Sequence, residues 1–245
     1  MKIPSLVFLA LVAVSFSAVQ GHAGNLYDRK IIEHRARQGE CTSENSEDCI
    51  NVIGDKAYSY QKRGYEKTGK RDERDGIGVN RDGKLTGANI PQEIRQRTIR
   101  EVHQYVDVEK KVNTGGEDVE VGAIKSDSVR KINQVRNIVD VRQKVGNVGN
   151  VAIGAVDVRN GGKVGSINNQ VMVQGGVNAD GRASIGGVRV GKGAAVDQVT
   201  SDVTVGGDVI ADGPINIGGV RVTNGTIGGV HSTTVIKGNV NATGN

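Results

Sequence analysis

The hexapeptide Ile-Gly-Gly-Val-Arg-Val occurs twice, as residues 185–190 and 217–222, so its second copy begins 32 residues after the first. Aligning the chain at this offset gives four copies, which begin at Val121, Ile153, Ile185 and Ile217. Apolar residues then fall into eight columns, and 30 of the 32 positions hold Val or Ile, the exceptions being Ser126 and Thr234. Such self-similarity is typical of arrays in which each unit buries its apolar side against its neighbours.

A weaker copy precedes these four at an offset of 33 residues, with matching positions at Ile99, Val102, Val106, Val108, Val112 and Gly116. It is more charged than the later copies, as expected of a terminal capping unit. We therefore expect a signal peptide at 1–21, a polar basic region with a small disulfide loop at 22–88, and a degenerate capping repeat at 89–120. Four β repeats follow over 121–245, namely 121–152, 153–184, 185–216 and 217–245.

The repeat predicts strands, although the spacing of Ile132, Val135 and Val139 also suits one face of a helix. Paired glycines such as Gly186-Gly187 would each cost a helix roughly 1 kcal/mol per glycine. Val-x-Val pairs alternate with period two, and the Asp-Gly and Asn-Gly steps favour tight turns. The predicted fold is an all-β solenoid, with two or three short strands per coil and coils stacked at roughly 4.8 Å. The alternative is a set of hairpins in a sandwich or barrel.

The first residues indicate export. Met1-Lys2 precedes an apolar run from Ile3 to Val19, and small residues follow it. This order is typical of a secretory signal peptide, with cleavage expected after Gly21 or Ala23. The alternative is a membrane anchor, but the run is short for a bilayer and lacks a basic stop. We expect a secreted, extracellular chain with no membrane span after cleavage.

The only cysteines, Cys41 and Cys49, flank an acidic loop. In an oxidising compartment they predict one small disulfide loop. Two cysteines without a nearby histidine are too few for a structural zinc site. Their spacing also differs from that of a Cys-x-x-Cys redox pair.

The region between the signal peptide and the repeats is polar and highly charged. We expect a short helix over Asn25–Gln38, a second over Ile90–Val106 that starts at Pro91, and disorder over Gln61–Asp75. Tyr58, Tyr60 and Tyr65 lie among basic residues and suggest adhesive cation–π contacts. The steps Lys62-Arg63 and Lys70-Arg71 suit either a solvated basic linker or processing of a secreted precursor.

No catalytic constellation is evident, and we expect neither enzyme activity nor a cofactor. His231 is the only histidine in the four repeats, at the position of Thr200, where a solvent-facing turn residue is expected. Asp180 and Asp212 lie one repeat apart and suggest weak calcium binding, but turn aspartates explain them more simply, so no metal site is predicted. Asn224 and Asn241 begin glycosylation sequons that matter only in a eukaryotic host.

The Val-rich repeats with Gly and Asn turns resemble in style the subunits of bacterial amyloid fibres, the curlins and the Fap proteins. Gly176-Val-Asn-Ala-Asp-Gly181 is similar to the Fap repeat phrase. The Gln/Asn ladders at the shorter curlin period are absent. The resemblance implies a self-assembling extracellular protein.

These features predict a secreted structural or adhesive repeat protein. The last copy keeps the pattern almost to Asn245, so we expect an uncovered strand edge there and self-association through the C-terminal coil. The net charge of +5 favours an anionic surface or polysaccharide as a further partner, and export argues against nucleic acid. The alternatives are a solenoid that binds or cleaves polysaccharide and a secreted precursor processed at the dibasic steps.

Overall fold

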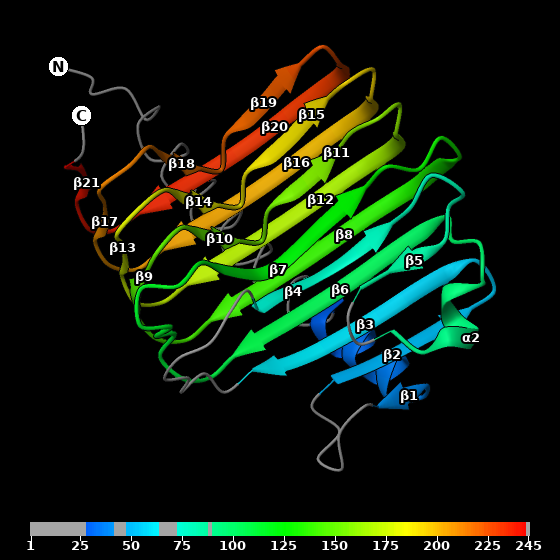
Figure 1. Cartoon of the computed structure of the whole chain (residues 1–245), viewed down its shortest axis with the longest axis horizontal. Helices are drawn as coiled ribbons and strands as arrows, with labels where there is room; N and C mark the ends of the chain where they lie inside the picture. Colours follow the sequence, from blue (N-terminus) through cyan, green and yellow to red (C-terminus); the bar gives the residue numbers. More distant parts are fainter. Residues whose placement is uncertain (1–27, 42–47, 64–72, 88–89, 244–245) are drawn as a thin grey trace, which may run out of the picture.

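The computed structural model describes residues 28–41, 48–63, 73–87 and 90–243. Most of these residues are in strands, and those from residue 101 onward form a parallel β-solenoid (Figure 1). The predicted fold class is therefore confirmed. The signal-peptide residues and the predicted disordered centre at 64–72 lie outside the described residues.

Each of the last three coils contains four strands rather than the two or three expected, whereas the first contains three, because its first strand pairs with both of the first two strands of the second coil. The first coil is β7 (Val119–Ser126), β8 (Lys131–Val141) and β9 (Val145–Val148). The second is β10 (Val151–Ile153), β11 (Val156–Val158), β12 (Lys163–Val173) and β13 (Val177–Ala179). The third is β14 (Ala183–Ile185), β15 (Val188–Gly191), β16 (Ala195–Val205) and β17 (Val209–Ala211). The fourth is β18 (Ile215–Ile217), β19 (Val220–Thr223), β20 (Thr226–Ile236) and β21 (Val240–Ala242).

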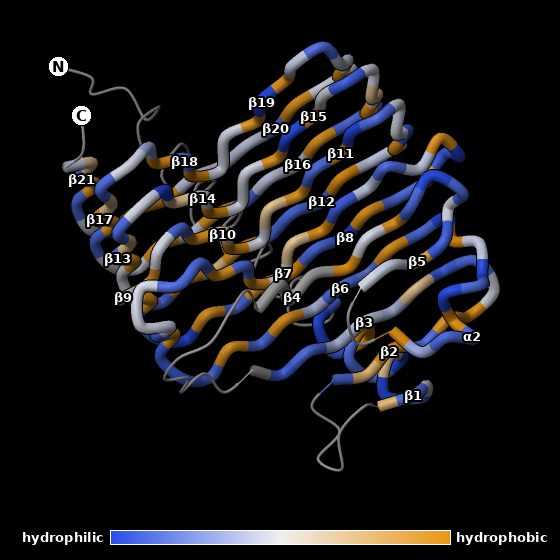
Figure 2. Tube along the Cα trace, in the orientation of Figure 1, coloured by the Kyte–Doolittle hydropathy of each residue, from blue (hydrophilic) through white to orange (hydrophobic). Residues whose placement is uncertain are grey.

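Three sheets form the walls of the solenoid. The long-strand sheet contains β8, β12, β16 and β20 in that order, and the split sheet places two short strands of each coil side by side with those of the next. The short sheet contains β9, β13, β17 and β21. Apolar residues alternate along the strands and line up from coil to coil (Figure 2).

The strand register reproduces the repeat. Val171 of β12 pairs with Val139 of β8 and with Val203 of β16, so each residue lies beside its own copy 32 positions away. Between β16 and β20 the offset falls to 31, because the last copy is one residue shorter. The columns counted in the sequence are thus physical columns in the interior.

The helix-like spacing within the columns has a local cause. The pairing of β12 passes from Val164 to Ser166 and leaves out Gly165, so two residues separate Val164 from the next buried side chain, Ile167. Beyond Ile167 the buried residues alternate with period two. An irregularity near the start of a strand therefore mimics one helical step.

The interior consists of two apolar clusters with a polar column between them. Val135, Ile167 and Val199 belong to one cluster, whereas the next columns along the same strands belong to the other. Between them lies the polar ladder, a column with one residue from each successive strand of the long-strand sheet: Gln104, Asn137, Asn169, Ser201 and Ser232. The first four are buried, and Ser232 in the last coil is exposed.

Hydrogen bonds connect the polar ladder along the solenoid axis. Nε2 of Gln104 donates to Oδ1 of Asn137 at 3.1 Å, and Nδ2 of Asn137 donates to Oδ1 of Asn169 at 3.0 Å. The amide nitrogens of Asn137 and Asn169 also donate to the carbonyls of Gly122 and Gly186, each at 3.0 Å. The two serine hydroxyls donate to glycine carbonyls at 3.1 Å and 2.8 Å. Each buried amide thereby has at least one hydrogen-bond partner, although Oε1 of Gln104 has none in the described structure.

The repeated hexapeptide supplies the corner opposite this ladder. Gly186 and its copy Gly218 have φ values of +64° and +63°, in the left-handed region that glycine adopts readily. A Cβ atom on Gly186 would collide with the side chain of Val203. The Ile before each glycine ends one short strand, and the Val-Arg-Val after the glycine pair lies in the next, so one hexapeptide encodes one corner of a coil.

An incomplete coil precedes β7. β6 (Glu101–Val108) pairs in parallel with β8 at the expected offset of 33, Val112 bridges Val145, and β4 (Glu73–Val79) pairs in parallel with β7. The predicted helix over Ile90–Val106 is wrong, since helix α2 (Gln92–Arg95) is a single turn after Pro91. From Glu101 onward the segment instead belongs to β6, where side chains alternate inward and outward with period two and extend the long-strand sheet.

Beyond β6 the long-strand sheet changes direction. β3 (Lys56–Arg63) pairs in parallel with β6, but β2 (Asp48–Ile53) and β1 (Glu40–Cys41) follow as antiparallel strands. β5 (Leu85–Thr86) pairs antiparallel with β4. Residues 28–37 form a helix, which agrees with the first predicted helix. The described part of region 22–88 is therefore largely ordered β structure, contrary to the expectation of loose order.

We expect Asn169→Ala to lower the free energy of unfolding by about 1–3 kcal/mol, because it removes the acceptor of the Asn137 amide and the donor to Gly186. The matched control is Asn168→Ala in the same strand. The Asn168 side chain faces outward and its Oδ1 has no hydrogen-bond partner in the described structure, so we expect a change within about 0.5 kcal/mol. Urea unfolding followed by circular dichroism measures both, and equal effects would contradict the ladder.

Candidate functional site

The candidate site is the open end of the solenoid. β18, β19, β20 and β21 are each the last strand of their sheet, and among the described residues they pair on one side only (Figure 1). β20 is the longest of these edges, with 11 residues. An edge of this kind presents a row of unpaired backbone donors and acceptors to a further strand.

Side chains at this end are exposed where their copies in the preceding coil are buried. Val230 is 53% exposed, whereas Val199, its neighbour in the same column, is 0% exposed. Val222 and Val240 are exposed to a similar extent, and their counterparts one coil earlier are fully buried. Complete burial of a Val side chain stabilises by about 1.5–3 kcal/mol, so covering each of these valines would contribute roughly 1 kcal/mol.

The edge strand also lacks the charges that commonly discourage pairing. β8, β12 and β16 each contain at least one Lys, Arg or Asp, but β20 contains none, and His231 is its one titratable side chain. His231 lies within the strand and pairs with Thr200, so the expectation of a turn residue is wrong. Arg221 and Lys237 lie in the same coil outside β20. The longest open edge therefore contains no Lys, Arg, Asp or Glu side chain.

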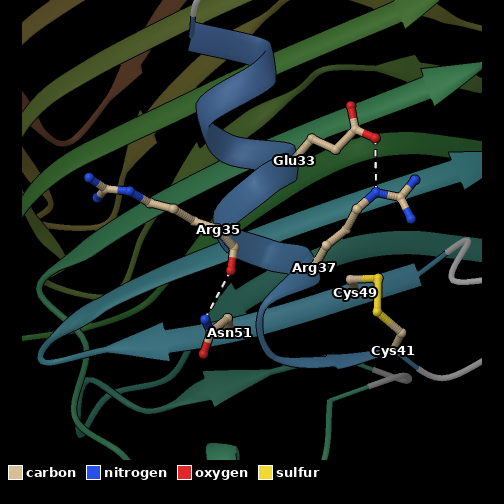
Figure 3. The surroundings of a disulfide bond; sticks show 6 residues. All are labelled: Glu33, Arg35, Arg37, Cys41, Cys49 and Asn51. Carbon is tan, nitrogen blue, oxygen red and sulfur yellow. Dashed lines mark hydrogen bonds and ion pairs between the residues drawn. A yellow bond between two sulfur atoms is a disulfide. The ribbon is translucent and has the colours of Figure 1, made fainter.

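The opposite end of the molecule is covered. The helix of residues 28–37 lies across the outer face of the long-strand sheet (Figure 3) and buries Ile32 and Ala36 against Tyr58, Tyr60 and Tyr105. The strand residues that alternate with these tyrosines point into the solenoid instead. The helix therefore packs on the outside of the sheet, over the strands that precede the regular coils.

Ion pairs attach the helix to the sheet. Arg29 pairs with Asp140 at 2.7 Å, and Asp28 pairs with Arg136 at 2.8 Å. Burial raises the pKa of Asp140, and the Arg29 guanidinium opposes that shift. Both sheet residues lie on β8, so the helix spans the incomplete coil and reaches the first complete one.

The tyrosines expected to serve adhesion are structural where they are described. Tyr58 and Tyr60 are each 3% exposed. The guanidinium carbons of Arg35 and Arg37 lie 5.0 Å and 4.7 Å from the two ring centroids, so the cation–π partners come from the helix and not from the neighbouring basic residues. The side chains are thus unavailable to an outside surface. Tyr65 lies outside the described residues.

The disulfide Cys41–Cys49 is present and joins β1 to β2 as directly opposed residues (Figure 3). Asn51 Nδ2, on the same strand as Cys49, donates to the backbone carbonyl of Arg35 at 2.9 Å. The covalent link and this hydrogen bond fasten the end of the helix to the antiparallel strands. The disulfide therefore belongs to the cover of the N-terminal end.

A buried histidine lies under this cover. His103 stacks on Tyr58 with ring centroids 4.9 Å apart, and its Nε2 lies 3.2 Å from a carboxylate oxygen of Glu101. Burial lowers the pKa of His103, with Glu101 opposing the shift and the cations of Arg136 and Lys56 adding to it. The histidine is therefore held neutral within the sheet that the helix covers.

The remaining predicted sites are dispersed. Asp180 and Asp212 occupy the same corner of consecutive coils, and Oδ1 of Asp212 accepts a hydrogen bond from Thr243 at 2.5 Å. No cluster of three or more His, Cys, Asp or Glu side chains suited to a metal occurs among the described residues. The sequon residues Asn224 and Asn241 are both exposed, the first in a turn with φ of 55° and the second in β21.

The first dibasic step is part of a sheet. Lys62 and Arg63 pair with Asp107 and Val108 of β6, and the Lys62 ammonium lies 3.1 Å from a carboxylate oxygen of Glu109. Cleavage there would require this pairing to open first. The step at Lys70-Arg71 lies outside the described residues.

Comparison with known proteins yields no relative: no family model, curated protein or solved structure matches the chain. Within the described ranges, no helix has the length and apolar character needed to cross a membrane. The open end and the covered end must therefore be interpreted from their own geometry.

We expect acidification to weaken the N-terminal cover through His103. Its folded-state pKa lies below the ordinary value of 6.5, so its contribution to stability is complete above that pH and is lost as the pH falls below it. His103→Phe retains the stacking on Tyr58 and cannot titrate. Between pH 7.5 and 5.5 the wild type should lose more thermal stability than the variant, and equal losses would show that His103 is not the sensitive group.

Proposed function

We propose that the protein is a secreted, non-catalytic structural repeat protein that associates with itself through its C-terminal coil. The observation that carries this proposal is the contrast between Val230 and Val199, two positions of one column that differ from half exposed to fully buried. In the last coil, the column residues that a following coil buries elsewhere in the solenoid are exposed. Another copy of the chain supplies a surface of the same spacing.

Export is supported by two features of different kinds. The N-terminal residues have the order of a secretory signal peptide, and Cys41 and Cys49 form a disulfide, which persists in oxidising compartments. In an extracellular setting, a stable rod with an unprotected edge serves as a building element. We also propose that the basic chain is attracted to a polyanionic surface or matrix polysaccharide.

A second candidate function, polysaccharide binding, is favoured by the outer face of the long-strand sheet. Outward columns over β12 and β16 contain amide and hydroxyl side chains, among them Asn168, Gln170 and Thr200. The side chains of Asn168, Gln170 and Thr200 are partly exposed. A sugar chain lying along this face would exchange hydrogen bonds with the accessible polar atoms of these side chains. Pull-down with a panel of insoluble polysaccharides tests this candidate, and Asn168→Ala with Gln170→Ala should abolish any capture.

The self-association proposal is tested with Val230→Lys. At the open end a lysine side chain can extend into water, so the chain should remain folded, but the charge should prevent another copy from covering the coil. We expect the wild type to show a concentration-dependent rise in mass by sedimentation velocity, and Val230→Lys to lower that association at least tenfold.

Val199→Lys is the matched control in the same column. It places a charge among fully buried neighbours and should unfold the solenoid, as circular dichroism will show. A wild type that remains monomeric at millimolar concentration would overturn the proposal, and so would a Val230→Lys variant that associates as strongly as the wild type.

A further inference from the structure

We propose that the partner of the open end is the open end of a second copy, joined by antiparallel pairing of the two β20 strands about a two-fold axis. This inference rests on the proposed self-association and specifies its geometry. It predicts a closed dimer instead of a growing fibre.

Strand direction allows two ways of covering β20. All four strands of the long-strand sheet in the complete coils are parallel, so a copy translated along the solenoid axis would have to offer its N-terminal edge to β20. A copy turned about an axis normal to this sheet would offer its own β20 in the opposite direction. The second arrangement is isologous, since each chain uses the same strand.

The N-terminal edge is unsuitable for the translated arrangement. Beyond β3 the sheet continues with antiparallel β2 and ends in β1, which has two residues and is joined to β2 by the disulfide. In the split sheet, β5 pairs antiparallel with β4 and interrupts the same face. A further β20 would meet short or antiparallel strands where a parallel coil is required. Short edges of this kind are a common protection against pairing.

β20 is suited to pairing with itself. Its 11 residues include no Lys, Arg, Asp or Glu, so pairing of two copies does not bring like charges of these side chains together. Directly opposed residues in an antiparallel pair face the same side of the sheet, so the inward residues Val230, Ser232 and Thr234 of one copy meet inward residues of the other. The two interiors then form one continuous core, with each polar ladder ending near the axis.

The arrangement closes after two chains. Each copy contributes its open end to the seam, and the covered ends, with their helices, lie at the two tips of the resulting rod. No further copy can add by the same contact. A two-fold contact therefore limits the assembly that an open edge would otherwise extend indefinitely.

Single-cysteine variants distinguish the two arrangements. Only a two-fold contact brings one β20 position close to the same position of another copy. We would make His231→Cys, Thr233→Cys and Val235→Cys separately in the full chain and treat each with a bismaleimide whose spacer is about 8 Å. That reach suits diagonal neighbours across an antiparallel pair, which lie roughly 7–8 Å apart. The native cysteines are occupied by their disulfide.

Thr200→Cys is the control, since it lies in the same outward column as His231 but is flanked by strands of its own chain. We expect at least one β20 variant to cross-link into a covalent dimer at least tenfold more than Thr200→Cys, with a sedimentation mass that stops at twice that of the chain. Mass that grows beyond two chains, with no β20 dimer, would overturn the two-fold geometry and leave self-association intact. A monomer at all concentrations would overturn both.

Discussion

A buried hydrogen bond between two asparagine side chains sets the register on which the solenoid depends. Asn137 donates to Asn169, and both amides also bond to glycine carbonyls across the narrow interior. Valine columns alone would tolerate a shift in strand register, because a Val side chain packs acceptably against many apolar neighbours. A buried amide does not tolerate such a shift. Moving the register by one residue leaves its donor and acceptor without partners, which costs about 1–3 kcal/mol for each group. The polar ladder thus selects one alignment among several that the valines allow.

The glycine corner is the other half of that constraint. The positive φ of Gly186 turns the chain between two short strands, and its carbonyl accepts a hydrogen bond from Asn169. Because Gly186 has no Cβ, there is room for Val203 of the facing strand. One residue therefore serves the turn, the hydrogen bond and the packing at once. These combined roles explain why the hexapeptide that contains Gly186 recurs unchanged one coil later.

The two ends of the solenoid differ in strand direction and in the elements that cover them. At the N-terminal end the parallel pattern gives way to antiparallel strands, a disulfide and a helix held by partly buried ion pairs, and the helix covers the tyrosines of β3 and β6. At the other end the last described coil repeats the interior pattern with no such cover. The valines that stabilise the rod elsewhere are half exposed there, and for this reason we propose that end as the surface for self-association.

The fold was predictable from the sequence because periodic apolar columns report burial directly. The offset of 32 residues, its change to 33 upstream and the shortened last copy all reappear in the strand pairs. The polar ladder was missed because only apolar positions were counted, although Asn137, Asn169, Ser201 and Ser232 occupy one position of the repeat and are all small and polar. The helix expected over Ile90–Val106 was wrong because Pro91 marks a helix start but does not determine its length.

The covered end was least predictable, since burial of Tyr58 depends on a helix whose residues are no nearer than 21 positions in the sequence. Basic neighbours suggested adhesion, but tertiary packing decided the exposure. Outward charges are also ambiguous in a sequence, because Arg29 beside Asp140 and Arg136 beside Asp28 appear as separate surface charges until the helix is placed.

The central claim is that 32 residues form one interchangeable coil held in register by the polar ladder. Deleting residues 185–216 removes one whole coil and joins Ser184 to Ile217, so that every column is preserved and Asn169 becomes the neighbour of Ser232. Deleting residues 185–200 removes half a coil, so the apolar residues after the deletion no longer align with the columns before it. Urea unfolding followed by circular dichroism should show a cooperative, β-rich protein with a smaller urea dependence for the whole-coil deletion, because less surface is exposed on unfolding. The half-coil deletion should be unfolded. A whole-coil deletion that is as unfolded as the half-coil deletion would contradict the account.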